Sequence, residues 1–304
     1  MKPHYRERAE LFGRERTLVG VTCRATRPRA DAPAVVFLNA GIISRVGANR
    51  LHVRLARALA SVGVHSLRFD MAGIGDSVIL PTSTSMTPER RVEIDIDDAV
   101  AFAQDRLGIR RVVLAGLCSG ADNALRSMDR HPSVVGAILL DLNTHQTRGF
   151  YLRHYGRRLL RRETWRNVLS GRHPLLRKLL ARARWVPVST EAPAPSSMDT
   201  LLPNTRLSLD HMRRTLEALV RRDAKLLAVF TAGFETQYNY GEQFREMLPG
   251  LDFRNSLQLE YFADSDHTFS RSDLQSRLTG TVVRWIENTQ FPSPTETPST
   301  KRAG

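Results

Sequence analysis

Cys118 has the sequence context of an enzyme nucleophile. It lies between Gly116 and Gly120 in the pattern Gly-x-Cys-x-Gly, after an apolar run that predicts a strand and before a predicted helix. A sharp strand-to-helix turn of this kind, a nucleophile elbow, crowds the positions two residues before and after the nucleophile, which therefore need small residues. Centring the turn on Ser119 would place the large Leu117 at a crowded position, which favours Cys118. The alternative is a structural role, since free cysteines often serve as small buried apolar residues.

A thiol at this turn predicts acyl chemistry. A thiolate attacks a carbonyl carbon and forms a covalent thioester, which exchanges with amines or thiols more readily than it hydrolyses. Cysteine therefore suits group transfer, or an activated substrate such as a thioester or a lactone, better than amide hydrolysis. The N-terminus of the following helix would stabilise the thiolate of Cys118, and the backbone N–H of Ser119 would face the oxyanion.

Strand and helix patterns alternate around this turn. Short apolar or alternating runs predict the strands, and apolar residues at helical spacing predict the helices between them. The predicted strands cover residues 17–23 (in an N-terminal hairpin), 34–38, 64–69, 111–115, 134–140, 226–231 and 257–262, and the predicted helices cover about 50–61, 91–107, 121–130, 241–248 and 271–288. This alternation is typical of βαβ units around a parallel sheet, so we expect an α/β fold.

The alternation stops in the middle of the chain. Residues 143–222 have a helical pattern that is rich in arginine and interrupted by prolines, which predicts an inserted helical cap. Residues 1–142 and 223–290 would then form the two parts of one α/β core. Residues 291–304 are rich in Pro, Ser and Thr, which predicts a disordered tail.

The composition fits a globular cytoplasmic protein. The 304 residues can hold one large α/β domain with an insertion, and two cysteines exclude a disulfide framework. A thiol nucleophile has to stay reduced, which favours the cytoplasm.

The N-terminus lacks the apolar core of a secretion signal, and no apolar run approaches the roughly 20 residues of a membrane helix. No metal-binding cluster is apparent, and the glycine motif at residues 73–75 lacks the third glycine of a dinucleotide site, so no cofactor is expected.

These motifs resemble the α/β-hydrolase superfamily over about residues 17–289. The elbow at 116–120 is a specific signal, and residues 70–77, Asp-Met-Ala-Gly-Ile-Gly-Asp-Ser, are similar to the D-x-x-G-x-G-x-S turn common after the fourth strand. Residues 38–41 and 45–50 resemble bacterial hydrolases of the exosortase-associated, serine-aminopeptidase-like type, and cysteine in place of the commoner serine resembles dienelactone hydrolases. The resemblance implies a mostly parallel central sheet flanked by helices, with a helical cap inserted after the sixth core strand.

The resemblance also implies a catalytic triad in the chain order nucleophile, acid, histidine. His267 matches the histidine, because it follows a late predicted strand and a polar loop. Glu235, after the predicted strand 226–231, has the usual position of the acid and is preferred, and Asp141, after the preceding strand, is the alternative. The histidine would take the thiol proton of Cys118 or pair with its thiolate, and the carboxylate would orient the imidazole without being protonated itself.

The loop after the predicted strand 34–38 would complete an oxyanion hole. The backbone N–H of Gly41 or Ile42 would join that of Ser119 in binding the oxyanion. Asn39-Ala40-Gly41 replaces the usual His-Gly loop of the superfamily, and the Asn39 side chain would either anchor this loop or belong to a merely structural turn.

The predicted cap is strongly basic. Between residues 148 and 184 it holds twelve Lys or Arg and one acid, Glu163, in a chain of net charge +14. Amphipathic helices with cationic outer faces would form a solvated lid over the core, or would attract an anionic surface or substrate. The partners this suggests, besides a small acyl substrate, are an acidic acyl- or peptidyl-carrier protein, a CoA ester, or the headgroups of an anionic membrane. Nucleic acid is disfavoured, because no recognition motif accompanies the charge.

The sequence thus predicts a cytoplasmic hydrolase of ester or thioester bonds that acts through an acyl-Cys118 intermediate. Two alternatives stay open. One is a transferase that moves an acyl or aminoacyl group from a carrier-protein or CoA thioester. The other is a binding protein without catalysis, because the same fold can host unrelated functions.

Overall fold

A single eight-stranded sheet organises the chain. The computed structural model describes residues 4–159 and 206–294. The strands are β1 (Tyr5–Phe12), β2 (Leu18–Ala25), β3 (Ala34–Leu38), β4 (Ser66–Phe69), β5 (Val112–Leu117), β6 (Val134–Leu140), β7 (Lys225–Thr231) and β8 (Leu257–Phe262). Their order across the sheet is β1-β2-β4-β3-β5-β6-β7-β8. The β1–β2 and β2–β4 pairs are antiparallel, and the other pairs are parallel.

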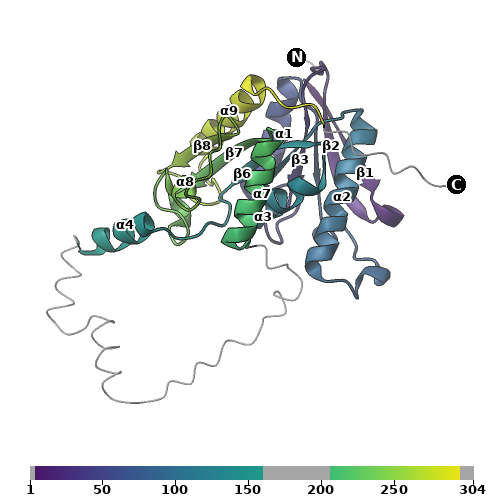
Figure 1. The fold of residues 1–304 in the computed structure, drawn as a ribbon. Coiled ribbons are helices and arrows are strands. Elements are labelled where there is room, and N and C mark those ends of the chain that lie inside the picture. Colours follow the sequence, from purple (N-terminus) through teal and green to yellow (C-terminus); the bar gives the residue numbers. More distant parts are fainter. Residues whose placement is uncertain (1–3, 160–205, 295–304) are drawn as a thin grey trace.

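Helices cover both faces of this sheet (Figure 1). The helices are α1 (Leu51–Ser61), α2 (Pro88–Leu107), α3 (Ser119–Ser127), α4 (Arg148–Leu159), α7 (Leu209–Arg221), α8 (Gln243–Glu246) and α9 (Ser272–Asn288). Short 3-10 helices are η1 (Arg14–Arg16), η2 (Ala48–Arg50), η3 (Pro81–Ser83), η4 (Met128–Arg130) and η5 (Ala232–Phe234). The apolar faces of α2, α3 and α7 pack on one side of the sheet, and those of α1 and α9 pack on the other.

The central strands are buried on both faces, which explains their uniformly apolar sequences. In β3, Val36 and Leu38 join the core under α2, α3 and α7, whereas Val35 and Phe37 join the core under α1 and α9. A strand covered on both sides gains from an apolar residue at every position, so it shows a continuous apolar run instead of alternation. The predicted α/β class with a mostly parallel sheet is therefore confirmed.

The C-terminal end of the predicted cap segment belongs to the core. There, α7 is amphipathic, and Met212, Leu216 and Leu219 are fully buried in the core with the strands. Residues 209–221 are thus one of the helices that cover the sheet, because the apolar stripe of α7 matches the sheet face. Residues 160–205, which hold much of the predicted basic cap, lie outside the described residues.

Phe291, the first residue of the predicted disordered tail, packs on the core. Phe291 packs edge-on against Trp285 of α9, with the ring centroids 5.4 Å apart, and its carbonyl accepts a hydrogen bond from Arg111. The side chain of Phe291 thus extends the core to residue 291, where the polar segment of the sequence begins. Residues 295–304 lie outside the described part of the chain. Among the helices that the structure describes, none is long and apolar enough to cross a lipid bilayer.

Candidate active site

Cys118 occupies the strained turn that its sequence context predicts. It lies between β5 and α3 with φ 55° and ψ −121°, a backbone conformation that is costly for a residue with a side chain. A Cβ atom on Gly116 would lie 2.2 Å from the carbonyl carbon of Gly120, and one on Gly120 would lie 2.6 Å from the carbonyl oxygen of Asn39. Both flanking positions therefore require glycine, and the sharp turn is centred on Cys118.

His267 follows β8 in a loop that brings it to the elbow. Its Nδ1 atom lies 2.8 Å from Oδ2 of Asp141. Burial by itself lowers the pKa of His267, but hydrogen bonds and charge interactions with Asp141 and Cys118 outweigh it and raise this pKa to about 9. The imidazole therefore favours its protonated form at neutral pH.

Asp141 is fully buried and held in a fixed position. It comes directly after β6, with φ 45°, and accepts hydrogen bonds from the backbone N–H and the hydroxyl of Thr231 at 2.7 and 2.6 Å. β6 and β7 are neighbours in the sheet, so the end of one strand supports the carboxylate at the end of the other. Thr231 was not singled out in the sequence, where a threonine ending a strand carries no specific signal.

The carboxylate at His267 is thus the alternative acid and not the preferred one. Glu235 is exposed, because the 3-10 turn η5 after β7 carries the chain to the surface before this residue. The residue of this turn that faces the histidine is Phe234, whose ring stacks on the imidazole at 4.5 Å. The prediction that Glu235 is the acid partner of the histidine is therefore wrong. Asp141, the earlier of the two candidate acids along the chain, contacts His267.

The loop after β3 approaches the elbow from the other side. The backbone N–H of Gly41 donates a hydrogen bond of 2.7 Å to Oγ of Ser119. The Asn39 side chain anchors this loop, since it donates to the carbonyl of Ile43 and accepts from the N–H of Met71, both at 2.9 Å. Of the two predicted oxyanion donors, Gly41 directs its backbone N–H at the elbow. The other, Ile42, is a residue that is 56% exposed.

The motif at residues 70–77 supports the same loop. The carboxylate of Asp70, which is fully buried, accepts hydrogen bonds from the backbone and the guanidinium of Arg45. Arg45 also forms an ion pair of 2.7 Å with Asp76. These ion pairs connect the turn after β4 to the loop after β3, so the motif has a structural role beside the site.

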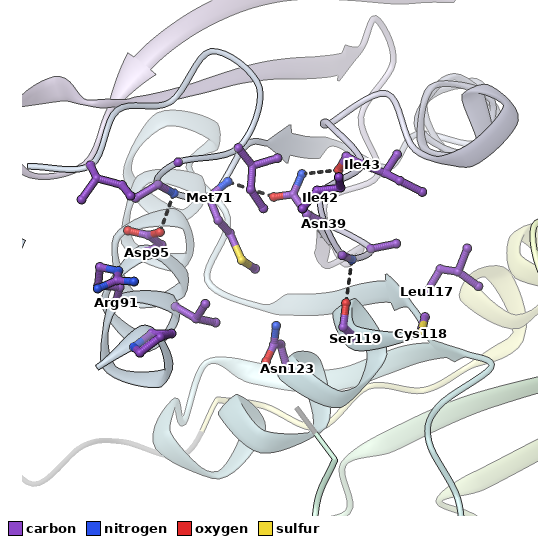
Figure 2. A pocket seen from close by; sticks show the side chains of 18 of the residues that line it. Asn39, Ile42, Ile43, Met71, Arg91, Asp95, Leu117, Cys118, Ser119 and Asn123 are labelled. Atoms are coloured by element: carbon purple, nitrogen blue, oxygen red, sulfur yellow. Dashed lines mark hydrogen bonds between the residues drawn. The ribbon is translucent and has the colours of Figure 1, made fainter. Parts of the chain in front are cut away.

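A cavity of about 740 Å³ opens beside Cys118 (Figure 2). It is bounded by the loops after β3 and β4, by α2, by the elbow with the start of α3, and by His267. This volume falls within the usual range for sites that bind small molecules. Within residues 4–159 and 206–294, no group of three or more His, Cys, Asp or Glu side chains is arranged to hold a metal ion.

Solved structures of known proteins share this architecture. An esterase from Pyrococcus furiosus matches with a TM-score of 0.52 and 14% identity, over 93% of this chain and 91% of the esterase. A proline iminopeptidase from Mycobacterium smegmatis matches with a TM-score of 0.55 and 17% identity, over 93% of this chain and 98% of the peptidase. The thioesterase domain from the curacin biosynthetic pathway matches with a TM-score of 0.50 and 15% identity, over 93% of this chain and 99% of the domain.

No protein-family model matches the sequence, and no curated protein matches it either. The structural similarity therefore stands on the arrangement of the elements. That arrangement includes the mostly parallel eight-stranded sheet, the helices on both of its faces and the strained turn after β5. Together with the similar structures, these features show that the chain has the α/β-hydrolase fold.

Proposed function

We propose that this protein hydrolyses ester or thioester bonds through a covalent acyl intermediate on Cys118. The observation that carries the proposal is the arrangement of three groups: the strained Cys118 and His267 both line the cavity, and the buried Asp141 holds the imidazole at 2.8 Å. A nucleophile, a base and a carboxylate that orients the base are the elements of acyl transfer. The proposal is also supported by the fold, which the chain shares with an esterase and a thioesterase domain.

In the first half of the reaction, the thiolate of Cys118 attacks the carbonyl carbon and forms a C–S bond. The negative charge moves to the carbonyl oxygen, where the N–H groups of Gly41 and Ser119 would bind it once the Ser119 hydroxyl releases Gly41. When the tetrahedral intermediate collapses, the bond to the leaving alcohol or thiol breaks. The His267 imidazolium gives its proton to that leaving group, and the acyl group remains on sulfur as a thioester.

In the second half, the neutral His267 takes a proton from water, and the resulting hydroxide attacks the acyl-Cys118 carbonyl. The C–S bond breaks, the carboxylic acid leaves, and Cys118 returns to a thiolate beside the imidazolium. Asp141 stabilises the imidazolium throughout and keeps Nε2 free to face the sulfur and the water.

Intact-protein mass spectrometry with acyl thioesters of N-acetylcysteamine tests this proposal. We expect a mass gain equal to the acyl group in the wild type, its loss in Cys118→Ala, and its decay in water. Cys23→Ala is the matched control, because Cys23 is fully buried in β2 and burial raises its pKa to about 12, which keeps that thiol unreactive.

The other outcomes separate the alternatives. An adduct that persists until an amine or a thiol is added would identify an acyltransferase. If no adduct forms with any thioester and iodoacetamide does not alkylate Cys118 at neutral pH, the catalytic proposal is wrong.

A further inference from the structure

The cavity beside Cys118 is apolar along most of its wall but polar at its far side. The apolar part comes from the loops after β3 and β4 and from the start of α2. Besides the polar side chains at the elbow, in the loop after β3 and in the loop of His267, three polar side chains line the cavity: Arg91 and Asp95 from α2, and Asn123 from α3. In Figure 2, α2 with Arg91 and Asp95 lies across the cavity from Cys118, and Asn123 lies between them on the floor.

Asn123 is the first of these groups whose surroundings indicate that a ligand binds here. Its side chain lines the cavity, yet the residue is only 4% exposed. In residues 4–159 and 206–294 no hydrogen bond is described for its amide, although the neighbouring Asp122 holds Asn143. The amide therefore faces the cavity with its donors and acceptor unpaired within the described chain, and a hydrogen-bonding group of a bound molecule would pair with them.

Asp95 is the second group. It is 7% exposed, and its Oδ2 accepts a hydrogen bond of 2.8 Å from the backbone N–H of Ala72. Its other oxygen, Oδ1, has no hydrogen-bond partner in the described chain. Burial raises the pKa of Asp95 to about 7, against the opposing effect of the Ala72 hydrogen bond, so the group is close to half-protonated at neutral pH.

Arg91 determines which charges the cavity tolerates. Its guanidinium donates to the carbonyl of Met86 at 2.7 Å and to that of Ser83 at 3.5 Å, which holds the cation at the side of the cavity near Asp95. A carboxylate on the ligand would be attracted by Arg91 but repelled by Asp95, and an ammonium would be attracted by Asp95 but repelled by Arg91. An uncharged group that both donates and accepts avoids both conflicts, and a hydroxyl is the smallest such group.

We propose that the cavity selects an acyl chain that carries a hydroxyl group, with Asn123 on the floor as the residue that recognises this hydroxyl and Asp95 on α2 as a second acceptor. The apolar wall contacts the hydrocarbon part of the chain, and the carbonyl lies at Cys118. Asn123 thus determines specificity without touching the reacting atoms. This assignment deepens the proposed hydrolase and rests on it for the identity of the ligand as an acyl group.

Binding to the Cys118→Ala protein tests the proposal without requiring turnover. The probes are the octanoyl, 3-hydroxyoctanoyl and 7-hydroxyoctanoyl thioesters of N-acetylcysteamine, with their dissociation constants measured by calorimetry. We expect at least one hydroxylated probe to bind about tenfold more tightly than octanoyl, as one buried hydrogen bond would give. Adding Asn123→Leu should abolish this preference. Met71→Leu, a change of similar volume on the apolar wall, should leave the ratio unchanged.

Two further probes test the choice of a neutral group. Octanoyl thioesters that end in a carboxylate or in an ammonium should bind more weakly than octanoyl itself. If the carboxylate probe binds most tightly, Arg91 would be an anion subsite and the proposal is overturned. Equal binding of all neutral probes, or no binding of any probe up to its solubility limit, overturns it as well.

Folding and catalysis are checked separately. Circular dichroism and thermal unfolding show whether Asn123→Leu folds, and Asn123→Ala provides a second variant in which the amide is lost without added bulk. Acyl transfer to wild-type Cys118 is followed in parallel by mass spectrometry. A hydroxyl preference without an acyl adduct would refute the hydrolase alone, whereas an adduct without a hydroxyl preference would refute the specificity proposal alone.

Discussion

At the scale of single residues, the site depends on how Asp141 is held. This carboxylate is removed from solvent, yet its two oxygens accept hydrogen bonds from Thr231 and contact the imidazole of His267. A buried carboxylate with these partners stays in one orientation, and the imidazole that it contacts is therefore held in one orientation as well. Thr231, at the end of β7, helps to hold the carboxylate of Asp141 in this orientation.

Replacing Asp141 by Asn tests its effect on the histidine. The substitution removes the negative charge that raises the pKa of His267, so this pKa should fall below its value of about 9. NMR of 13C-labelled histidine measures the titration directly. Under the proposed mechanism, kcat/KM should also fall by about 100-fold or more.

Glu235→Gln is the matched control for that substitution. Glu235 is the exposed carboxylate that follows β7, so its amide variant should leave both the titration of His267 and kcat/KM unchanged. A His267 titration that is identical in wild type and Asp141→Asn would contradict the role assigned to Asp141.

At the scale of elements, the elbow and the loop after β3 pack so closely that they form one unit. Gly120, in the first turn of α3, lies against the carbonyl oxygens of Leu38 and Asn39, and the Gly41 N–H binds the Ser119 hydroxyl. The position of the predicted oxyanion donors therefore depends on a contact between backbones. Backbone atoms cannot move aside as the end of a flexible side chain can.

Gly120→Ala should consequently destabilise the protein and reduce activity. The new Cβ would meet backbone oxygens at 2.6 and 2.9 Å, so we expect the free energy of unfolding to fall by roughly 1–3 kcal/mol or more. Urea unfolding measures the change. Gly156→Ala is the control, because a Cβ there meets nothing within 4 Å in the described chain and alanine favours the helix α4. Equal stability of the Gly120→Ala variant and the wild type would show that this contact can relax.

At the scale of the whole molecule, the ionised form of Asp95 at the polar side of the cavity lowers the free energy of unfolding. Asp95 sits within the layer of α2 against the sheet, and burial raises its pKa to about 7. The folded chain thus binds this proton more tightly than the unfolded chain. The contribution of Asp95 to the free energy of unfolding is therefore most favourable below about pH 4 and declines as the pH rises to about 7.

The Asp95→Asn variant should lack this decline. The amide keeps an acceptor for the Ala72 N–H but does not ionise. The stability of the variant relative to the wild type should therefore increase between pH 4 and pH 8, by about 4 kcal/mol at most. Urea unfolding at several pH values measures this difference. A stability difference that does not change with pH would show that Asp95 is not the buried acid described here.

The features of this protein that depend on local patterns follow from the order of its residues. The apolar runs of β3, β5, β6 and β7 predict a buried parallel sheet, because strands covered on both faces need apolar residues at every position. The spacing of two glycines around Cys118 predicts the strained turn, because steric crowding there acts over two residues on either side. The place of His267 after a late predicted strand likewise predicts that it lies near the turn.

Only the tertiary structure decided what depends on neighbours in space. Asp141 and Glu235 both follow strands, and nothing local distinguishes them; the adjacency of β6 and β7 supports Asp141, whereas the turn η5 carries Glu235 to the surface. α7 could be assigned to the sheet layer only once its apolar stripe had a sheet face to cover. The polar side of the cavity is likewise not visible in the sequence, since Asn123 looks like any polar helix residue until the fold places it at the wall of the cavity.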